Sequence, residues 1–159
     1  MTMDSHIADG HLSTNSNLQR SQSITSEEIS PLAKRILMVD DDPDITLTFK
    51  KGLEAENEKS SKIFFKVDSC NNPLQALSEF KPDYYDLILI DINMPRMDGI
   101  ELASKILELD ANVKICLVTA GEANIEVLRE LYPTRDIGCF IKKPVTIDYL
   151  VRRIRAELE

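Results

Sequence analysis

The sequence predicts an α/β fold, in which a parallel β-sheet lies between two layers of helices. The clearest strand candidates, Ile36–Val39 and Leu87–Ile90, are short and wholly apolar, which is typical of parallel strands buried on both faces. Segments with helical spacing of apolar residues separate such runs, so that strand and helix alternate five times. Because crossovers between parallel strands are nearly always right-handed, this alternation favours helices on both faces of the sheet.

The composition describes one folded unit of ordinary size. The chain has 159 residues, of which 43% are hydrophobic and 29% are charged. A formal net charge of −8, without a dense run of Lys and Arg, argues against direct binding to nucleic acid, which relies on neutralising phosphates. No apolar run approaches the length that spans a bilayer, so we expect no membrane insertion.

The cysteines indicate a reducing compartment. Cys70, Cys116 and Cys139 are far apart and lack the CxxC spacing of metal sites. Cys116 and Cys139 lie within apolar runs, which favours buried free thiols over disulfides. Since the N-terminus also lacks the apolar core of a signal peptide, we expect a cytoplasmic protein.

Residues 1–33 are predicted to form a disordered tail. They are polar, rich in Ser, Thr and Asn, and show neither helical nor strand periodicity. Such a segment buries too little apolar surface to offset the entropy lost on folding. The pattern changes at Lys34, and residues 34–159 are predicted to form the single folded domain.

The first half of this domain begins with the strand Ile36–Val39. Asp42 suits the N-cap of the helix that follows, and Asn72 suits the N-cap of the next helix. Between these helices, Ile63–Val67 is predicted to be an edge strand, because Lys66 interrupts its apolar run. The two helices are expected to bury Ile45, Phe49, Leu53, Leu74, Leu77 and Phe80.

The second half repeats the alternation. Its predicted strands are Leu87–Ile90, Ile115–Val118 and Cys139–Ile141. Its predicted helices run from Asp98-Gly99 to about Asp110, from Asn124 to Leu131, and from about Thr146 onward. The inward residues of the first and last of these helices are expected to be Ile100, Ala103, Leu107, Leu150, Val151, Ile154 and Leu158.

Reactive side chains stand where the apolar strands end. These are Asp40, Asp41, Asp91, Thr119 and Lys143. Parallel strands bring their carboxyl ends to one edge of the sheet, where α/β proteins bind ligands. Like charges ~4 Å apart cost about 4 kcal/mol at an effective dielectric near 20, so three carboxylates there need a cation. Oxygen ligands without His or Cys suit Mg²⁺.

The hydroxyl and the ammonium group complete a set suited to phosphate. A single Asp at a strand end often does no more than cap the turn, but the other strand ends favour a chemical role here. Carboxylates, a metal ion, a hydroxyl and an ammonium group together indicate phosphoryl chemistry with one aspartate as acceptor.

These motifs resemble the receiver domain of the two-component response regulator family. The resemblance covers residues 34–159 and rests on Ile36–Asp42, Leu89–Gly99, Val118–Ala120 and Lys143-Pro144. It implies a flavodoxin-like, doubly wound sheet of five parallel strands in the order 2-1-3-4-5. It also implies phosphorelay signalling, with Asp91 accepting a phosphoryl group from a sensor histidine kinase or a phosphotransfer protein.

The resemblance implies roles for the other matched residues as well. Mg²⁺ would be held by Asp40, Asp41, Asp91 and the backbone carbonyl of Asn93. Thr119 and Lys143 would bind the phosphoryl group, and a cis bond before Pro144 would aim the lysine. Phe140 matches the aromatic position whose rotamer follows the Thr119 hydroxyl.

The expected output is protein–protein contact. No output domain follows the last helix, so we expect a stand-alone regulator that acts on a downstream protein target. We expect no enzymatic activity beyond self-catalysed phosphorylation and dephosphorylation.

Two alternatives remain open from the sequence alone. An aspartate-nucleophile phosphohydrolase of the haloacid dehalogenase class would use Asp40-Asp41-Asp42, but it needs an acidic pair beyond the lysine, where only Asp148 occurs. That alternative also leaves Asp91 without a role. An inactive pseudo-receiver that serves only as a docking module is the second alternative.

A calcium-binding EF-hand loop at Asp40 is excluded. Such a loop needs Gly and a bidentate Glu at the positions that Ile45 and Lys51 occupy here.

Overall fold

The computed structural model describes residues 32–59, 62–121, 125–131 and 137–159. Within these ranges strand and helix alternate as predicted, with one short 3₁₀ helix, η1 (Glu56–Glu58). Most of the predicted tail, residues 1–31, lies outside the described residues. Leu32 and Ala33, which were predicted to belong to the tail, are part of the first strand.

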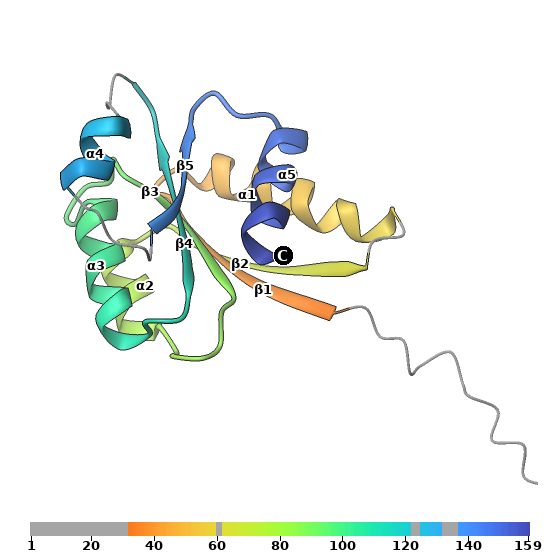
Figure 1. Ribbon diagram of the computed structural model, residues 1–159, viewed down its shortest axis with the longest axis horizontal. Helices are drawn as coiled ribbons and strands as arrows, with labels where there is room; N and C mark the ends of the chain where they lie inside the picture. Colours follow the sequence, from red (N-terminus) through yellow and green to blue (C-terminus); the bar gives the residue numbers. More distant parts are fainter. Residues whose placement is uncertain (1–31, 60–61, 122–124, 132–136) are drawn as a thin grey trace, which may run out of the picture.

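The sheet has five strands in the order β2-β1-β3-β4-β5 (Figure 1). They are β1 (Leu32–Val39), β2 (Ile63–Cys70), β3 (Leu87–Asp91), β4 (Lys114–Thr119) and β5 (Ile137–Lys142). Every neighbouring pair is parallel, which confirms the predicted fold class and strand order. The strand that contains Lys66 lies at an edge, as its interrupted apolar run predicted.

Helices cover both faces of the sheet (Figure 1). They are α1 (Pro43–Ala55), α2 (Pro73–Glu79), α3 (Gly99–Leu109), α4 (Ile125–Leu131) and α5 (Ile147–Leu158). Helices α1 and α5 pack on one face, whereas α2, α3 and α4 lie on the other. The side chains of Asp42, Asn72, Asp98 and Thr146 cap their helices by accepting backbone N–H groups, which confirms the N-cap predicted at Asp42.

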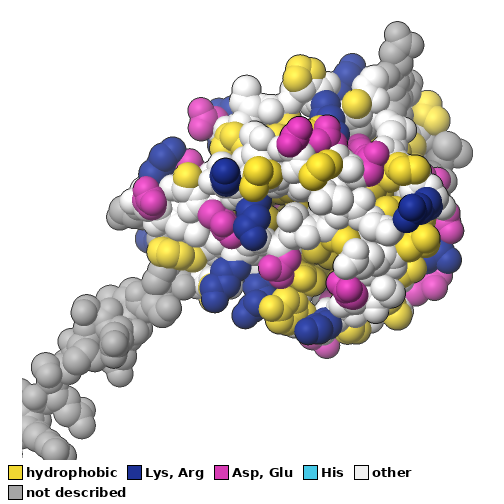
Figure 2. Space-filling model, turned by 180° about the vertical axis from the view of Figure 1, so that it is seen from behind, with side chains coloured by type: hydrophobic (Ala, Val, Ile, Leu, Met, Phe, Trp, Pro, Cys, Tyr) yellow, Lys and Arg dark blue, Asp and Glu magenta, His cyan; other side chains and the backbone are white. Residues whose placement is uncertain are grey.

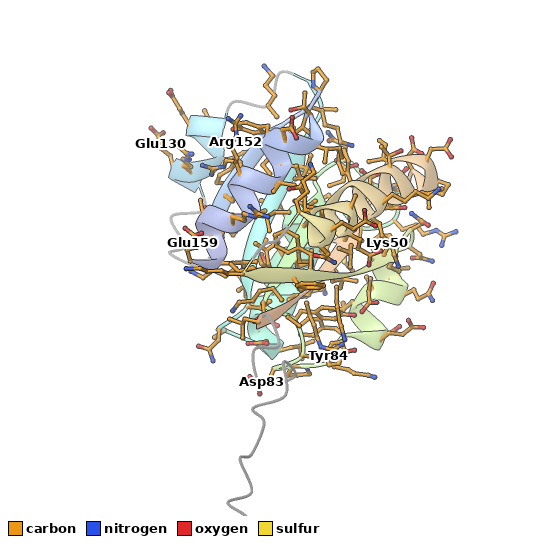
Figure 3. All side chains as sticks on the ribbon, turned by 90° about the vertical axis from the view of Figure 1, so that its right-hand side faces the viewer. Lys50, Asp83, Tyr84, Glu130, Arg152 and Glu159 are labelled. Carbon is orange, nitrogen blue, oxygen red and sulfur yellow. The ribbon has the colours of Figure 1, made fainter. Side chains whose placement is uncertain are left out.

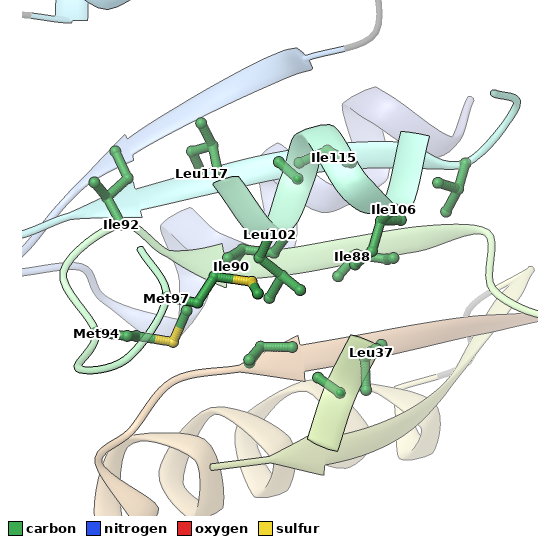
Figure 4. Close-up of a cluster of buried hydrophobic side chains, with 14 of the residues drawn as sticks. Leu37, Ile88, Ile90, Ile92, Met94, Met97, Leu102, Ile106, Ile115 and Leu117 are labelled. Carbon is green, nitrogen blue, oxygen red and sulfur yellow. The ribbon is translucent and has the colours of Figure 1, made fainter. Parts of the chain in front are cut away.

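Strand β3 runs through the middle of the core. Ile88 and Ile90 point toward the side of α2 and α3, and Leu87 and Leu89 point toward α1 and α5. Figure 4 shows the first of these two clusters, with Ile88 and Ile90 close to side chains of α3. Because all four side chains are essentially inaccessible, each contributes about 2 kcal/mol through burial. The charged residue that ends this strand is thus carried on a rigid support.

Some details of the predicted elements are wrong. Leu74 is 46% exposed instead of inward, because α2 contacts the sheet through the opposite side of the helix, where Ala76 and Phe80 are buried. In α3 the fully buried residues are Leu102, Ala103 and Ile106, each 0% exposed, so the prediction for Ala103 is confirmed. The predicted inward residues Ile100 and Leu107 are only half-buried and flank that stripe.

The edge strands are longer than predicted. Strand β2 continues to Cys70, since β1 pairs with it along all eight of its residues. Strand β5 likewise begins at Ile137, two residues before the predicted start. Pairing with β1 therefore extends β2 into polar sequence, and pairing with β4 extends β5 across Gly138.

The surface carries charges of both signs. On the face drawn in Figure 2, Lys and Arg side chains are interspersed with Asp and Glu instead of forming one basic patch. Among the described helices, none is both long and apolar enough to cross a membrane.

Candidate functional site

Three carboxylates gather at the carboxyl edge of the sheet. Asp91 is the last residue of β3, and Asp40 and Asp41 directly follow β1. One oxygen of each lies within 4.8 Å of the others. Asp40 and Asp91 are buried, whereas Asp41 is exposed, so the cluster opens to solvent on the side of Asp41. The structure therefore brings together the acidic residues that the strand ends predicted.

Lys143 reaches this cluster from the end of β5. Its Nζ atom lies 3.0 Å from Asp40 Oδ2 and 3.7 Å from Asp91 Oδ1. The Lys143–Pro144 peptide bond is cis, as expected, and the Lys143 N–H donates to the Thr119 carbonyl at 2.8 Å. One ammonium group cannot neutralise three carboxylates, so the cluster keeps a net negative charge.

The environment of Asp91 disfavours its charged form. Burial, together with the negative charge of Asp40, raises the pKa of Asp91 to about 6, although Lys143 and the Asn93 N–H act in the opposite direction. Its Oδ1 atom is buried without a hydrogen-bond partner. A cation bound at this position would offset the buried negative charge, and a bound cation or phosphoryl group would occupy the place beside the unpartnered oxygen.

Thr119 presents a second unsatisfied polar atom. The residue ends β4, is fully inaccessible, and its Oγ1 atom lacks a hydrogen-bond partner among the described residues. Strand β4 pairs with β3 so that Asp91 lies opposite Val118, the residue before Thr119. Buried polar atoms are nearly always hydrogen-bonded. The unpartnered Asp91 Oδ1 and Thr119 Oγ1 atoms at the carboxyl edge of the sheet therefore indicate a place for a polar ligand.

Phe140 lies below this edge, in the core. It belongs to β5, is 8% exposed and packs in the cluster on the side of α2 and α3. The Arg129 guanidinium of α4 lies 5.6 Å from the centre of its ring. Strand pairing places Phe140 opposite Leu117, two residues before Thr119. The predicted coupling of its rotamer to the Thr119 hydroxyl stays a prediction.

Asn93 lies in the loop that joins β3 to α3. Its backbone N–H donates to the Asp91 carboxylate, and its side-chain Nδ2 donates to the Ala120 carbonyl at 3.4 Å. The metal-ligand role predicted for its own carbonyl stays a prediction. In the same loop Met94 and Met97 are buried against the α3 side of the core, so they support the loop from the inside (Figure 4).

Two neighbouring residues, Asp42 and Lys142, lie outside the cluster. The Asp42 side chain caps α1 by accepting the N–H groups of Asp44 and Ile45. Lys142 is exposed on the surface next to Lys143.

Gly99 matters to the site more than its sequence signal suggested. The Asp98-Gly99 pair indicates a turn and a helix cap, and Asp98 does cap α3. A Cβ atom on Gly99, however, would lie 2.1 Å from the backbone oxygen of Asp91. The Gly99 N–H donates to the Ile92 carbonyl at 2.8 Å. Only glycine lets α3 begin this close to the strand end that carries Asp91.

Asn71 was missed by reasoning from the sequence. It follows β2, and its Nδ2 atom donates both to the Asp40 carbonyl at 2.8 Å and to Thr46 Oγ1 at 3.0 Å. These bonds hold the acidic loop against the first turns of α1. No local pattern marks Asn71, because β2 ends in polar residues that resemble an ordinary loop.

The chain matches the family model of the response regulator receiver domain over residues 36–155. It is 34% identical to the response regulator receiver protein CpdR of Brucella abortus, over 79% of this chain and 97% of CpdR. It is 33% identical to the sensor protein EvgS of Escherichia coli, over 72% of this chain but only 9% of EvgS. For the transcriptional regulatory protein PrrA of Mycobacterium tuberculosis, the identity is 28% over 78% of this chain and 49% of PrrA.

Solved structures agree with this assignment. A CheY-like response regulator receiver domain protein from Methanospirillum hungatei superposes with a TM-score of 0.65 at 29% identity, over 79% of this chain and 94% of that one. The non-phosphorylated HemR receiver domain from Leptospira biflexa gives a TM-score of 0.66 at 25% identity, over 79% and 94% of the two chains. With its fold, its acidic strand edge and its matched residues all in agreement, the chain belongs to the response regulator receiver domain family.

Proposed function

We propose that Asp91 is the phosphoryl acceptor of this receiver domain, and that a phosphohistidine on a sensor histidine kinase or a phosphotransfer protein is the donor. Receiver domains are signalling modules of phosphorelays, and in this chain Asp91 would carry the phosphoryl group. The observation that carries it is the buried Oδ1 atom of Asp91, at the end of the central strand. It has no hydrogen-bond partner among the described residues and lies 3.7 Å from the Lys143 ammonium group.

The donor set favours Mg²⁺ as the metal ion. Three carboxylates lie within 4.8 Å of one another, one of them exposed, and hard oxygen ligands of this kind suit Mg²⁺. In the proposal Asp40, Asp41, Asp91 and the Asn93 backbone carbonyl hold the ion. When bound, Mg²⁺ neutralises negative charge on the carboxylates and on the incoming phosphoryl group.

The reaction is an in-line transfer. A carboxylate oxygen of Asp91 attacks phosphorus, the bond between phosphorus and the donor histidine nitrogen breaks, and an acyl phosphate forms. The Lys143 ammonium group pairs with a phosphoryl oxygen, and the Thr119 hydroxyl donates to another. Both groups already lie at the carboxyl edge of the sheet, which lowers the entropic cost of bringing them to the transition state.

We assign signalling to a shift between two arrangements of Thr119 and Phe140. Phosphate on Asp91 favours the arrangement in which the hydroxyl faces it, and the aromatic side chain follows. A downstream protein target recognises the resulting surface. Relaxation-dispersion NMR on the phosphorylated protein checks this step, and an unchanged Phe140 ring would contradict it.

A labelling experiment tests the acceptor. The protein is incubated with Mg²⁺ and acetyl phosphate, and its intact mass is measured. One added phosphoryl group is expected for the wild type and none for Asp91→Asn. Asp42→Asn is the matched control, since Asn is also a good helix cap and the residue lies outside the cluster, and it should be labelled like the wild type.

The same experiment separates the alternatives. Loss of label in Asp40→Asn, with label retained in Asp91→Asn, would favour the phosphohydrolase. A wild-type protein that takes up no phosphoryl group would favour the docking module. In the proposal, turnover is limited to self-catalysed phosphorylation and dephosphorylation.

A further inference from the structure

Two buried cysteines face each other outside the acidic site. Cys116 on β4 and Cys139 on β5 are register partners on neighbouring strands, and both are fully inaccessible. Both belong to the core cluster on the side of α1 and α5. Neighbouring strands lie about 4.8 Å apart, which is within the Cα separation of roughly 4.4 to 6.8 Å that disulfides span.

An irregularity in the sheet creates this pairing. Ile115 pairs with Ile137, but the next residue, Cys116, pairs with Cys139, so that Gly138 is an extra residue on β5. In a regular ladder Gly138 would stand opposite Cys116, and Cys139 would point to the other face of the sheet. The bulge therefore brings the second sulfur to the first.

Arg153 makes the two thiols chemically different. Its Nη2 atom, on α5, donates to Cys139 Sγ at 3.2 Å. Hydrogen bonds from the Cys116 thiol and from Arg153 lower the pKa of Cys139, against the effect of burial. The pKa of Cys116 is raised by the same sulfur–sulfur hydrogen bond and by burial. Cys139 is therefore the thiol of the pair that ionises more readily.

The surroundings favour oxidation over metal binding. The guanidinium group in contact with Cys139 repels a metal cation, and among the described residues no third soft ligand joins the pair. Cys139 lies on the edge strand β5, and the Arg153 side chain in contact with its sulfur is 33% exposed, so the sulfur lies close to the protein surface.

We propose that Cys116 and Cys139 are a modification site at which a hydroperoxide forms an intramolecular disulfide. The Cys139 thiolate attacks one oxygen of hydrogen peroxide, the O–O bond breaks, and the leaving hydroxide takes a proton to become water. The Cys116 sulfur then attacks the sulfenic acid on Cys139, an S–S bond forms, and a second water leaves with the Cys116 proton. Two thiols lose two electrons, and one peroxide becomes two waters.

The test uses Cys70→Ser protein, which removes the remaining thiol. The folded protein is treated with hydrogen peroxide, unfolded, alkylated with N-ethylmaleimide and analysed by intact mass and peptide mapping. A loss of two hydrogen atoms, no alkylation and a linked Cys116–Cys139 peptide are expected. Adding Cys116→Ser should leave a Cys139 sulfenic acid that dimedone traps, because the resolving thiol is gone.

Arg153 supplies the matched comparison. Arg153→Met should slow disulfide formation about tenfold near neutral pH, because fewer molecules carry the Cys139 thiolate. Arg153→Lys should keep most of the rate. Arg152→Met is the control, since Arg152 is exposed on the same helix (labelled in Figure 3) and should leave the rate unchanged.

Three results would overturn the proposal. One is the absence of any two-hydrogen loss in folded protein under conditions that oxidise the unfolded protein. Another is a disulfide that joins two chains instead of one. The third is equal slowing by Arg153→Met and Arg152→Met, with circular dichroism showing both variants folded.

Discussion

Two aspartates, Asp91 and Asp110, are equally buried at opposite edges of the sheet. Each is 6% exposed. Asp91 ends β3 at the carboxyl edge, and Asp110 follows α3 just before β4, at the amino edge. The difference between them lies in the groups that surround each carboxylate.

The Asp110 carboxylate has a donor for each oxygen. The Asp83 N–H donates to Oδ2 and the Asn112 N–H donates to Oδ1, both at 2.9 Å. Asp83 is labelled at this edge in Figure 3. By contrast, Asp91 faces two other carboxylates and keeps one oxygen without a hydrogen bond. Burial with full hydrogen bonding is typical of a structural aspartate, and burial among like charges is typical of a reactive one, which supports the role proposed for Asp91.

Asp86 extends the same contrast. It lies at the amino edge, where its carboxylate accepts the Arg35 N–H at 2.8 Å and lies 3.6 Å from the Lys34 ammonium group. The acids at the amino edge are thus hydrogen-bonded or ion-paired, whereas at the carboxyl edge the Oδ1 atom of Asp91 has no hydrogen-bond partner among the described residues.

The largest expected effect is at Asp110. Replacing Asp110 with Ala should lower the free energy of unfolding by about 2 to 3 kcal/mol, because two partly buried backbone N–H groups lose their acceptor. Urea denaturation measures it. Asp110→Asn keeps an acceptor oxygen and should lose about half as much. Equal stabilities of the Ala and Asn variants would show that the hydrogen bonds accepted by Asp110 do not stabilise the fold. They would then not explain the difference between the amino and carboxyl edges.

Gly99 tests how tightly the carboxyl edge is built. Gly99→Ala should cost about 2 kcal/mol of stability, since its Cβ would collide with the Asp91 backbone, and it should slow labelling by acetyl phosphate. Gly52→Ala is the control. Its Cβ would meet only the Ile147 side chain, at 2.6 Å, and a helical alanine regains about 1 kcal/mol. If both variants unfold at the same urea concentration, the close contact of Gly99 with the Asp91 backbone does not limit the stability of the fold.

Asn71 should support metal binding from outside the cluster. Asn71→Ala removes both hydrogen bonds that hold the acidic loop, and we expect about tenfold weaker Mg²⁺ binding by isothermal titration calorimetry. Asn112→Ala, at the amino edge, should bind Mg²⁺ like the wild type, because only its backbone N–H is used there. An unchanged affinity in Asn71→Ala would mean that the loop holds its shape without this side chain.

The smallest expected effect is that of the Asp91 charge on the stability of the fold. Since the folded state raises the pKa of Asp91 from 3.8 to about 6, the charged carboxylate destabilises the fold, and this cost grows as pH rises through that window. Asp91→Asn should therefore stabilise the metal-free protein by about 1 kcal/mol at neutral pH and by little near about pH 4. Urea denaturation in EDTA at both pH values measures it. A variant that is less stable than the wild type at neutral pH would contradict this account of the site.

The parallel fold and the position of the site were predictable from the sequence. Apolar runs such as Leu87–Ile90 predict strands buried on both faces, and their alternation with helices predicts that the strands run parallel. Once they do, Asp40, Asp91, Thr119 and Lys143 must meet at one edge, because each lies at or directly after the carboxyl end of its strand. The resemblance to receiver domains added the strand order.

Only the tertiary structure separates Asp91 from Asp110 and shows what Asn71, Gly99 and the cysteine pair contact. The partners of Asp110 and Asn71 include residues 27 and 31 positions away in the chain. Gly138 brings Cys139 to Cys116 through a bulge that no local pattern indicates. Periodicity and spacing determine which face of an element is buried, because they depend on near neighbours. Whether a buried carboxylate or thiol is satisfied depends on atoms that only folding brings into contact.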